Sequence, residues 1–176
     1  MREVWEEIGS DRESGARRLV AEFGNRLYAA ALLLCQNRSD AEDLVFRAFE
    51  RAIERIDRYR PTGEFYGWLY VIMLNLWRMD IRRPRPDVVS VGATTDLPEA
   101  SDAALADSLA GVDAEAIRAT VRRLSPTLAE VIVLRFFEGR SMDEMAAMLG
   151  VPGGTVRSRL FNAKAALGNL LKEARP

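Results

Sequence analysis

Residues 141–171 read SMDEMAAMLGVPGGTVRSRLFNAKAALGNLL, and this stretch decides the fold of the C-terminal part of the chain. Ser141 followed three residues later by Glu144 is a capping box, which predicts a short helix over residues 142–149 that the next glycine ends. After the turn, Thr155 is expected to cap a last helix that runs to about residue 171. Two helices joined by a tight turn are the helix-turn-helix arrangement.

The last helix is predicted to have one buried face and one outward face. Its apolar residues recur on one side at helical spacing: Val156, Leu160, Ala163, Leu167 and Leu170. The outward side carries Arg157, Ser158, Phe161 and Asn162, flanked by Arg159 and Lys164. In the major groove Arg matches guanine and Asn matches adenine, and the flanking cations can hold phosphates. The alternative is a solvated polar face, although an outward Phe161 needs a partner.

Helical periodicity continues through the rest of the chain, so the predicted fold class is all-α. Ser39 with Glu42 is a second capping box, and Pro61 disfavours helical geometry in the residue before it. Ser125 followed by Pro126 gives a further helix start. Together with the apolar spacing, these signals predict helices over residues 17–35, 39–60, about 65–82 and 126–139.

Charge divides unevenly along the chain, although the formal net charge is only −1. Residues 86–112 hold 5 acidic and no basic side chains and are rich in small residues, which is typical of a flexible linker. Residues 1–85 hold 15 basic and 14 acidic side chains, and residues 113–176 hold 10 and 7. We therefore expect two small helical domains, 1–85 and 113–176, joined by an acidic linker, 86–112.

The residue types that are missing exclude several classes of function. The chain has no histidine and one cysteine, Cys35, which rules out zinc sites built from Cys and His, histidine-based triads and intrachain disulfides. We expect no metal and no cofactor. The N-terminus carries Glu3, Glu6 and Glu7 where a secretory signal needs basic residues, and no apolar run reaches membrane-spanning length. The sequence therefore predicts a cytoplasmic protein without membrane insertion.

The helix predicted after residue 39 carries Phe46 at the edge of its apolar stripe, beside Asp43 and Glu50. An acidic, partly apolar strip would suit a basic partner helix, but packing of Phe46 against the first helix agrees equally well with the periodicity. Trp68 and Trp77 at helical spacing are more often core residues than a base-stacking platform. The basic residues near residue 82 form a patch that is weak evidence by itself.

Five motifs occur in order along the chain: Asp40-Ala41-Glu42-Asp43-Leu44-Val45, Trp68-Leu69, Asn75 with Arg82-Arg83, Leu124-Ser125-Pro126, and Gly154-Thr155-Val156-Arg157-Ser158-Arg159-Leu160. In this order and spacing, over residues 15–172, the chain resembles the extracytoplasmic-function (ECF) sigma factors of bacterial RNA polymerase, in the sigma-70 family. The resemblance implies a bacterial specificity subunit, not an enzyme. It would consist of a region 2 helical bundle and a region 4 helix-turn-helix domain that recognise two promoter elements.

The resemblance also implies partners. In the family, the helix that matches residues 39–60 binds a coiled coil of the largest subunit of core polymerase, and the flap of the second-largest subunit is a further contact. An anti-sigma protein usually holds such a factor inactive. The implied core-binding candidates are Asp40, Asp43, Leu44, Phe46, Arg47 and Glu50. The family usually has Gln-Glu where this chain has Phe46-Arg47, so we expect the strength or selectivity of core binding to differ.

Two sets of DNA contacts follow from the same resemblance. A loop matching residues 57–64 captures a flipped base of the downstream element in the family. The candidates there are Arg60, Phe65, Asn75, Arg78, Asp80, Arg82 and Arg83. The candidates for the upstream element are Thr155, Arg157, Ser158, Arg159, Phe161, Asn162 and Lys164. Asn162 occupies a position where arginine is common, which predicts a shifted base preference.

Three alternatives compete with a sigma factor. The first is a sigma-like mimic that sequesters a regulator without initiating transcription, and the substitution of Phe46-Arg47 motivates it. The second is a helix-turn-helix regulator that works without polymerase, which leaves the first domain unexplained. The third is an enzyme that uses carboxylates such as Asp40 and Asp43, which are better explained by the helix start that they follow.

Overall fold

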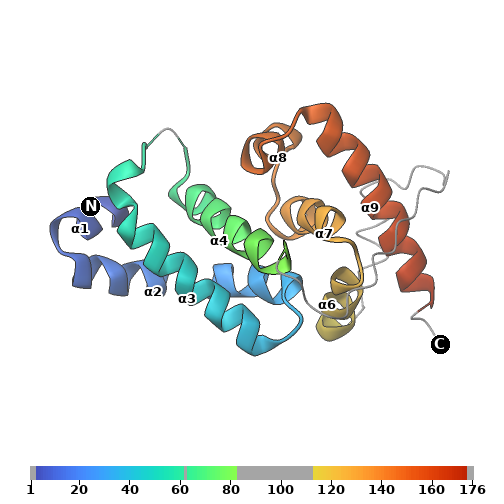
Figure 1. Ribbon diagram of the computed structural model, residues 1–176, viewed down its shortest axis with the longest axis horizontal. Helices are drawn as coiled ribbons and strands as arrows, with labels where there is room; N and C mark the ends of the chain where they lie inside the picture. The colour runs from blue at the N-terminus through green and yellow to red at the C-terminus, as the bar shows by residue number, and fades with distance from the viewer. Residues whose placement is uncertain (1–2, 62, 83–112, 174–176) are drawn as a thin grey trace. The chain divides into compact units, whose positions relative to one another are not determined.

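The computed structural model describes residues 3–61, 63–82 and 113–173, and every regular element in these ranges is a helix (Figure 1). The predicted all-α fold class is confirmed. The chain divides into two compact units, residues 1–85 and residues 86–176. The predicted acidic linker, residues 86–112, and Arg83 lie outside the described residues. Within the described parts, no helix combines the length and the apolar character that crossing a bilayer requires.

In residues 3–61 and 63–82, the first unit shows a short helix, three longer helices and one 3-10 turn. They are α1 (Val4–Ser10), α2 (Arg12–Leu34), α3 (Arg38–Glu54), the turn η1 (Ile56–Arg58) and α4 (Phe65–Arg82). Helix α2 packs against α3, α3 packs against α4, and α1 packs against both α2 and η1. Trp77 belongs to the buried core, where its indole Nε1 donates a hydrogen bond to the carbonyl of Leu34 at 3.2 Å.

The capping box predicted for Ser39 and Glu42 is wrong. Helix α3 begins one residue earlier, because the side chain of Asn37 accepts a hydrogen bond from the backbone N–H of Asp40 at 2.8 Å. Asparagine is as good an N-cap as serine, so Asn37 starts the helix and Ser39 lies within its first turn. The regular helix also ends earlier than predicted, at Glu54, and the chain continues as η1.

The N-terminal residues extend the bundle beyond the helix predicted from residue 17. Helix α2 begins at residue 12, because Asp11 caps it by accepting hydrogen bonds from the N–H groups of Glu13 at 3.1 Å and Ser14 at 3.3 Å. Before this cap lies α1, whose side chains Val4 and Ile8 are buried. Only two of its seven residues are buried, so its apolar pattern is too short to give a clear helical period.

Over its described residues, 113–173, the second unit contains four helices and one π-helical turn. They are α6 (Ala114–Arg122), α7 (Pro126–Ile132), the π-helical turn η2 (Val133–Phe137), α8 (Met142–Leu149) and α9 (Gly153–Glu173). Helix α9 packs against α6, α7 and α8. The helical path of α7 and η2 ends before Gly139, whose φ of 65° lies in the left-handed region, as the sequence predicts.

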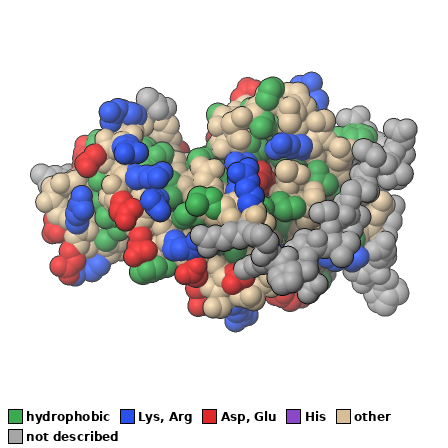
Figure 2. Space-filling view, in the orientation of Figure 1, with side chains coloured by type: hydrophobic (Ala, Val, Ile, Leu, Met, Phe, Trp, Pro, Cys, Tyr) green, Lys and Arg blue, Asp and Glu red, His purple; other side chains and the backbone are tan. Residues whose placement is uncertain are grey.

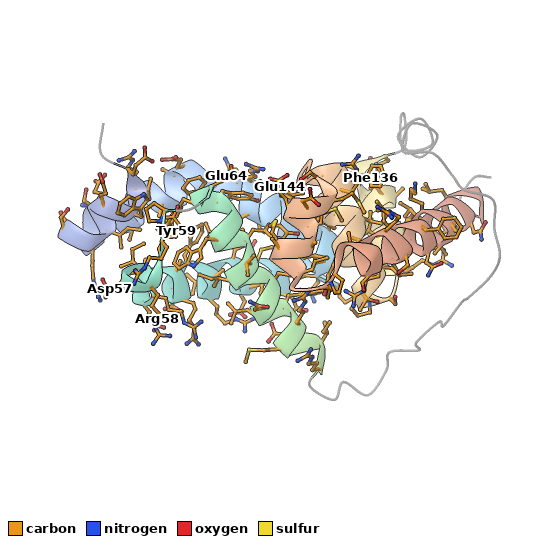
Figure 3. All side chains as sticks on the ribbon, turned by 90° about the horizontal axis from the view of Figure 1, so that it is seen from above. Asp57, Arg58, Tyr59, Glu64, Phe136 and Glu144 are labelled. Atoms are coloured by element: carbon orange, nitrogen blue, oxygen red, sulfur yellow. The ribbon has the colours of Figure 1, made fainter. Side chains whose placement is uncertain are left out.

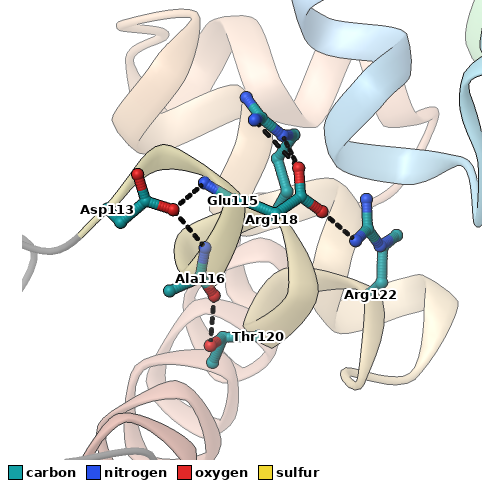
Figure 4. Close-up of polar contacts among 6 residues, drawn as sticks. All are labelled: Asp113, Glu115, Ala116, Arg118, Thr120 and Arg122. Atoms are coloured by element: carbon teal, nitrogen blue, oxygen red, sulfur yellow. Dashed lines mark hydrogen bonds and ion pairs between the residues drawn. The ribbon is translucent and has the colours of Figure 1, made fainter.

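Helix α6 was not predicted, and polar contacts define both its start and its exposed side (Figure 4). Asp113 caps the helix by accepting from the backbone N–H of Glu115 at 2.9 Å. The Glu115 carboxylate pairs with Arg122 at 2.8 Å and with Arg118 at 2.9 Å. The hydrogen bonds from these two guanidinium groups, first that of Arg122, lower the pKa of Glu115.

Helices α8 and α9 form the predicted helix-turn-helix. The capping box is confirmed: Ser141 Oγ accepts from the N–H of Glu144 at 3.3 Å, and Glu144 Oε2 accepts from the N–H of Ser141 at 2.9 Å. Gly150 ends α8 with a φ of 67°. Thr155 is not the cap of α9, because the helix begins at residue 153 and Thr155 donates its N–H to the carbonyl of Pro152 at 2.9 Å.

Candidate functional site

One exposed row of α3 carries three of the six residues predicted to bind a partner. Asp43, Phe46 and Glu50 are exposed, and Phe46 has 62% of its surface accessible. The sequence left open whether Phe46 packs against the first helix, and its exposure decides against that packing. Asp40 is half-buried. Leu44 is 1% exposed and belongs to the core, so its side chain cannot touch a partner while the bundle is folded.

Arg47, also predicted to bind a partner, is held by two carboxylates of its own unit. Its Nε lies 2.8 Å from Oδ2 of Asp43, one helical turn away on α3. Its Nη1 donates to Oδ1 of Asp80 at 3.2 Å, and its Nη2 donates to Oδ2 of the same residue. The hydrogen bonds with Asp80, followed by the charge of that carboxylate, raise the pKa of Arg47.

The Arg47–Asp80 pair joins α3 to the last turn of α4, so it connects a predicted partner contact with a predicted DNA contact. Sequence reasoning missed this pair because two residues 33 positions apart share no local periodicity. The forked geometry leaves Arg47 directed at its own unit instead of outward. Phe46, the next residue, is then the distinctive exposed feature of α3.

The loop before α4 is the second predicted contact region, and residues 57–61 and 63–64 of it are described. Asp57, Arg58 and Arg60 are exposed, whereas Tyr59 is 8% exposed. In Figure 3, Asp57 and Arg58 lie at the edge of the bundle and Tyr59 lies inward. Arg60 turns its Nη1 back to the carbonyl of Asp57 at 3.2 Å, which gives the exposed loop a defined shape.

Phe65, predicted to lie behind this loop as a DNA contact, is a core residue. It is 9% exposed, and its ring lies edge-on to Tyr59 at 5.0 Å between centroids and 5.5 Å from Trp68. Phe23 of α2 completes the cluster at 5.7 Å from Phe65. The prediction of a direct base contact by Phe65 is therefore corrected: this ring supports the loop from below and does not reach the surface.

The C-terminal half of α4 presents polar and apolar side chains side by side. Asn75, Arg78 and Arg82 follow one another at three- and four-residue steps and so share one face of the helix; Asn75 and Arg82 are exposed and Arg78 is half-buried. Met79 is 56% exposed in the same stretch. Asp80 points instead to Arg47, so its carboxylate is engaged within the bundle.

The outward face of α9 agrees in part with the prediction. Arg157 and Ser158 are exposed, and Thr155, Arg159, Phe161 and Asn162 are half-buried. The predicted inner face is buried at Val156, Leu160, Ala163 and Leu167, while Leu170 is half-buried. Lys164 is 9% exposed, so the prediction that it holds a phosphate is corrected. Lys164 lies beside Ala163 on the buried side of α9, whereas helical periodicity had placed it at the edge of the outward face.

Charge on these units is mixed, not segregated. Figure 2 shows Arg side chains interspersed with Asp and Glu across the face of the first unit that this view presents. Several basic residues are already in ion pairs, such as Arg18 with Glu7 at 2.9 Å and Arg17 with Glu13 at 2.9 Å. Binding to a polyanion would therefore depend on particular residues and not on a uniformly basic surface.

Comparison with known families matches each of the two units to a family model. The model of sigma-70 region 2 matches residues 19–86, and the model of sigma-70 region 4 matches residues 114–167. The ECF RNA polymerase sigma factor EcfG of Rhodopseudomonas palustris is 32% identical over 152 residues, which cover 82% of this chain and 78% of EcfG. The chain belongs to the ECF sigma factors. The predicted family is confirmed, with its two regions in the predicted order.

Two further relatives extend the comparison of this ECF sigma factor. The sigma factor SigE of Mycolicibacterium smegmatis is 35% identical over 158 residues, covering 87% of this chain, and the chain spans 60% of the length of SigE. The solved structure of CnrH in complex with the cytosolic domain of CnrY has a TM-score of 0.70 and 27% identity, and the match covers 98% of this chain and 97% of CnrH. The region 2 match begins within α2 and leaves α1 outside.

Proposed function

We propose that this ECF sigma factor binds core RNA polymerase and directs it to promoters with two recognition elements. The observation that carries the proposal is the presence of region 2 and region 4 in one chain, in that order, with a helix-turn-helix whose second helix exposes Arg157 and Ser158 in its first turns. Side chains near the N-terminus of a second helix are those that enter the major groove. The first unit, residues 1–85, would contact polymerase and the downstream element, and residues 113–176 the upstream element.

Core polymerase would meet the exposed row of α3. Asp43 and Glu50 offer negative charge beside the apolar ring of Phe46, which suits a helical partner with basic and apolar side chains. We assign this contact to the coiled coil of the largest subunit and a contact with the second unit to the flap of the second-largest subunit. Because Arg47 is paired with Asp80, we expect the aromatic ring to contribute more than the guanidinium group.

DNA contacts would use two surfaces. On the first unit they are the 57–64 loop and the face of α4 that carries Asn75 and Arg82. On the second unit they are Arg157, Ser158 and the half-buried Asn162. An arginine fork reads guanine, whereas an amide reads adenine, so Asn162→Arg should change the preferred base at one position of the upstream element. A binding-site series with the same base preference in both proteins would contradict that assignment.

An anti-sigma protein is the proposed regulator, acting in the bacterial cytoplasm. The support is structural: CnrH, which is similar over nearly the whole chain, was solved in complex with the cytosolic domain of CnrY. The exposed apolar side chains Phe46 and Met79 of the first unit offer surface for such a protein. If the same residues serve core polymerase, the two partners would compete, and competition would be measurable as loss of core binding when the regulator is added.

The test is transcription in vitro with purified core polymerase and a genomic fragment library, with and without the full chain. We expect new start sites that share two spaced sequence motifs. Arg157→Ala should abolish most of these starts, whereas Asn169→Ala, an exposed position further along α9, should leave them unchanged and serves as the matched control. Core polymerase that binds the chain but yields no starts on any fragment would contradict promoter recognition.

The same experiment decides the competing sigma-like mimic. The departure Phe46-Arg47 in α3 motivates this alternative. A regulator that works without polymerase would leave the whole first unit unexplained. A mimic would not bind core polymerase in a pull-down, although its helix-turn-helix unit would be folded. Absence of both core binding and new starts would therefore replace the proposal with the mimic.

A further inference from the structure

The N-terminal helix α1 is fixed firmly to α2. Val4 and Ile8 are buried, and Glu7 accepts a hydrogen bond from Ser14 Oγ at 2.7 Å and pairs with Arg18 at 2.9 Å. The two backbones meet at Gly15, where an added Cβ would lie 2.5 Å from the backbone nitrogen of Ile8. Only glycine permits this approach, so the position of α1 is set by backbone contact as well as by side chains.

Helix α1 carries Trp5 to the base of the 57–64 loop. The Trp5 ring lies 5.8 Å from the ring of Tyr59, which also contacts Phe65 at 5.0 Å and Trp68 at 5.2 Å. Tyr59 is therefore enclosed by aromatic rings from α1 and α4, and burial is the main cause that raises the pKa of its hydroxyl. Removing Trp5 would open one side of this enclosure.

Tyr59 in turn fixes the backbone of the loop. Its hydroxyl donates a hydrogen bond to the carbonyl of Gly63 at 3.0 Å, which ties Tyr59 to the residue four positions later. Arg60 Nη1 donates to the carbonyls of Asp57 at 3.2 Å and of Tyr59 at 3.3 Å on the same segment. Figure 3 shows Asp57 and Arg58 at the outer edge beside the inward Tyr59, so one buried ring determines where the exposed side chains stand.

We propose that α1 is a positioning element for promoter recognition: Trp5 holds Tyr59, and Tyr59 holds the loop in the conformation that receives a single-stranded base of the downstream element. This inference rests on the proposed function of the loop. Helix α1 lies before residue 19, where the region 2 match begins, so the family match itself assigns it no role. A loop ordered before binding loses less conformational entropy when the DNA strand arrives.

The test uses the holoenzyme assembled from the full chain and core polymerase. The probes are fluorescent single strands taken from the downstream element of the strongest start site, in the native sequence and with single-base substitutions. For Trp5→Ala we expect binding of the native strand to weaken about fivefold to tenfold, and binding of the substituted strands to weaken less, because an unsupported loop no longer favours one base. Trp5→Phe should restore most of the discrimination.

Two variants separate positioning from simple loss of stability. Gly15→Ala displaces α1 while both rings remain, and it should reduce discrimination as Trp5→Ala does. Tyr59→Phe keeps the ring contacts but removes the hydrogen bond to Gly63, so we expect an intermediate loss. Val20→Ala, which shortens a half-exposed side chain of α2, is the matched control and should behave as the parent.

The inference is overturned if Trp5→Ala and Gly15→Ala bind core polymerase normally and discriminate between strands as well as the parent does. It is also overturned if all strands weaken by the same factor, since α1 would then contribute only to stability. Should these two variants fail to assemble with core polymerase, Tyr59→Phe decides, and unchanged discrimination rejects the inference. A parent holoenzyme that binds no strand selectively would instead contradict the proposed function of the loop.

Discussion

Arg47 shows how a single side chain can change the character of a surface. Its guanidinium group forms an ion pair with Asp43 on its own helix and hydrogen bonds with Asp80 on α4, and it therefore cross-links two elements of the first unit. Both side chains of the Arg47–Asp80 pair are about one-quarter to one-third exposed, at 32% and 25%. The pair is screened by solvent on one side, so it contributes modestly to stability while orienting Arg47 strongly.

We expect a double-mutant cycle of Arg47→Ala and Asp80→Ala to give a coupling free energy of about 1 kcal/mol, at the upper end for exposed pairs because the contact is bidentate. The measurement is the free energy of unfolding in urea for the two single variants, the double variant and the parent. Arg51→Ala with Glu54→Ala, whose atoms lie 3.7 Å apart on one helix, provides the comparison and should couple less. Equal coupling in both cycles would contradict the cross-linking role.

The titration of Glu144 is tied to the fold of α8. Hydrogen bonds from the backbone and side chain of Ser141, and then from Arg140, lower its pKa to about 2 from an ordinary value of 4.5. A carboxyl group whose pKa is lowered on folding stabilises the folded state above its unfolded pKa. That contribution is lost as the pH falls from about 4.5 toward 2.

Glu144→Gln should therefore destabilise α8 at neutral pH, and its difference from the parent should shrink as the pH is lowered below 4.5. Amide hydrogen exchange of residues 142–149, corrected for the intrinsic rate at each pH, measures this in the full chain. Asp143→Asn, a neighbouring exposed acid in the first turn, is the control variant. A difference between Glu144→Gln and the parent that stays constant down to pH 2 would show that the charge is not the cause.

At the scale of elements, two glycines lie at the turn between α8 and α9, and only one of them has a backbone conformation that favours glycine. Gly150 has a φ of 67°, where an L side chain is strained, whereas Gly153 begins α9 without a positive φ and with open space around its Cα. Gly150→Ala should cost about 1–2 kcal/mol of unfolding free energy. Gly153→Ala should stay within about 0.5 kcal/mol of the parent.

Thermal unfolding followed by far-ultraviolet circular dichroism distinguishes the two glycines, because α9 is packed by α6, α7 and α8 and its loss removes much of the helical signal of the second unit. Equal effects of the two substitutions would mean that the turn tolerates another backbone conformation. The upstream-element affinity should follow the same order, since the turn sets the angle at which α9 leaves α8.

Helices with a strong cap or a long apolar stripe could be predicted from the sequence, and short or competing ones could not. Helix α4 and the Ser141–Glu144 capping box are where the pattern placed them. Ser39 failed because Asn37, two residues before it, competes for the same helix end. Helices α1 and α6 have seven and nine residues, two of which are buried in each, and the caps that open them, Glu3 with Glu6 and Asp113, were not recognised in the sequence.

The candidate surfaces could be located by periodicity, but the state of individual side chains depends on tertiary packing. Helical spacing gives Arg157 and Ser158 an outward position, and both are exposed. Phe65 lies in the core because three rings contact it: Phe23 of α2, Tyr59 just after η1, and Trp68 of α4. No local sequence pattern contains that information. The pairing of Arg47 with Asp80 is likewise a contact between distant segments.

For the molecule as a whole, polymerase binding is expected to depend on an aromatic contact. Phe46 is the most exposed of the large apolar side chains in the described residues, and its neighbour Arg47 is engaged elsewhere. Phe46→Ala should weaken core polymerase binding by about tenfold, as for a residue near the centre of an interface. The measurement is the dissociation constant of the full chain for core polymerase.

Val20→Ala removes a comparably exposed apolar side chain from α2 and should leave that constant unchanged. Phe46→Gln tests the polar alternative, because the family pattern that the chain resembles has Gln at this position. Tighter binding by Phe46→Gln would mean that Phe46 lowers the affinity of this sigma factor for core polymerase. An unchanged constant for Phe46→Ala would place the polymerase contact outside the exposed row of α3.

The aromatic residues are shared unequally between the two units, and this gives the protein a built-in optical reporter. All three tryptophans, Trp5, Trp68 and Trp77, belong to the first unit, and the second unit has none. Selectively excited tryptophan emission therefore records the environment of the first unit alone, which contains region 2. If duplex DNA carrying the upstream element alters this emission, region 4 transmits its occupancy to region 2; if the spectrum is unmoved, the two halves read their elements independently.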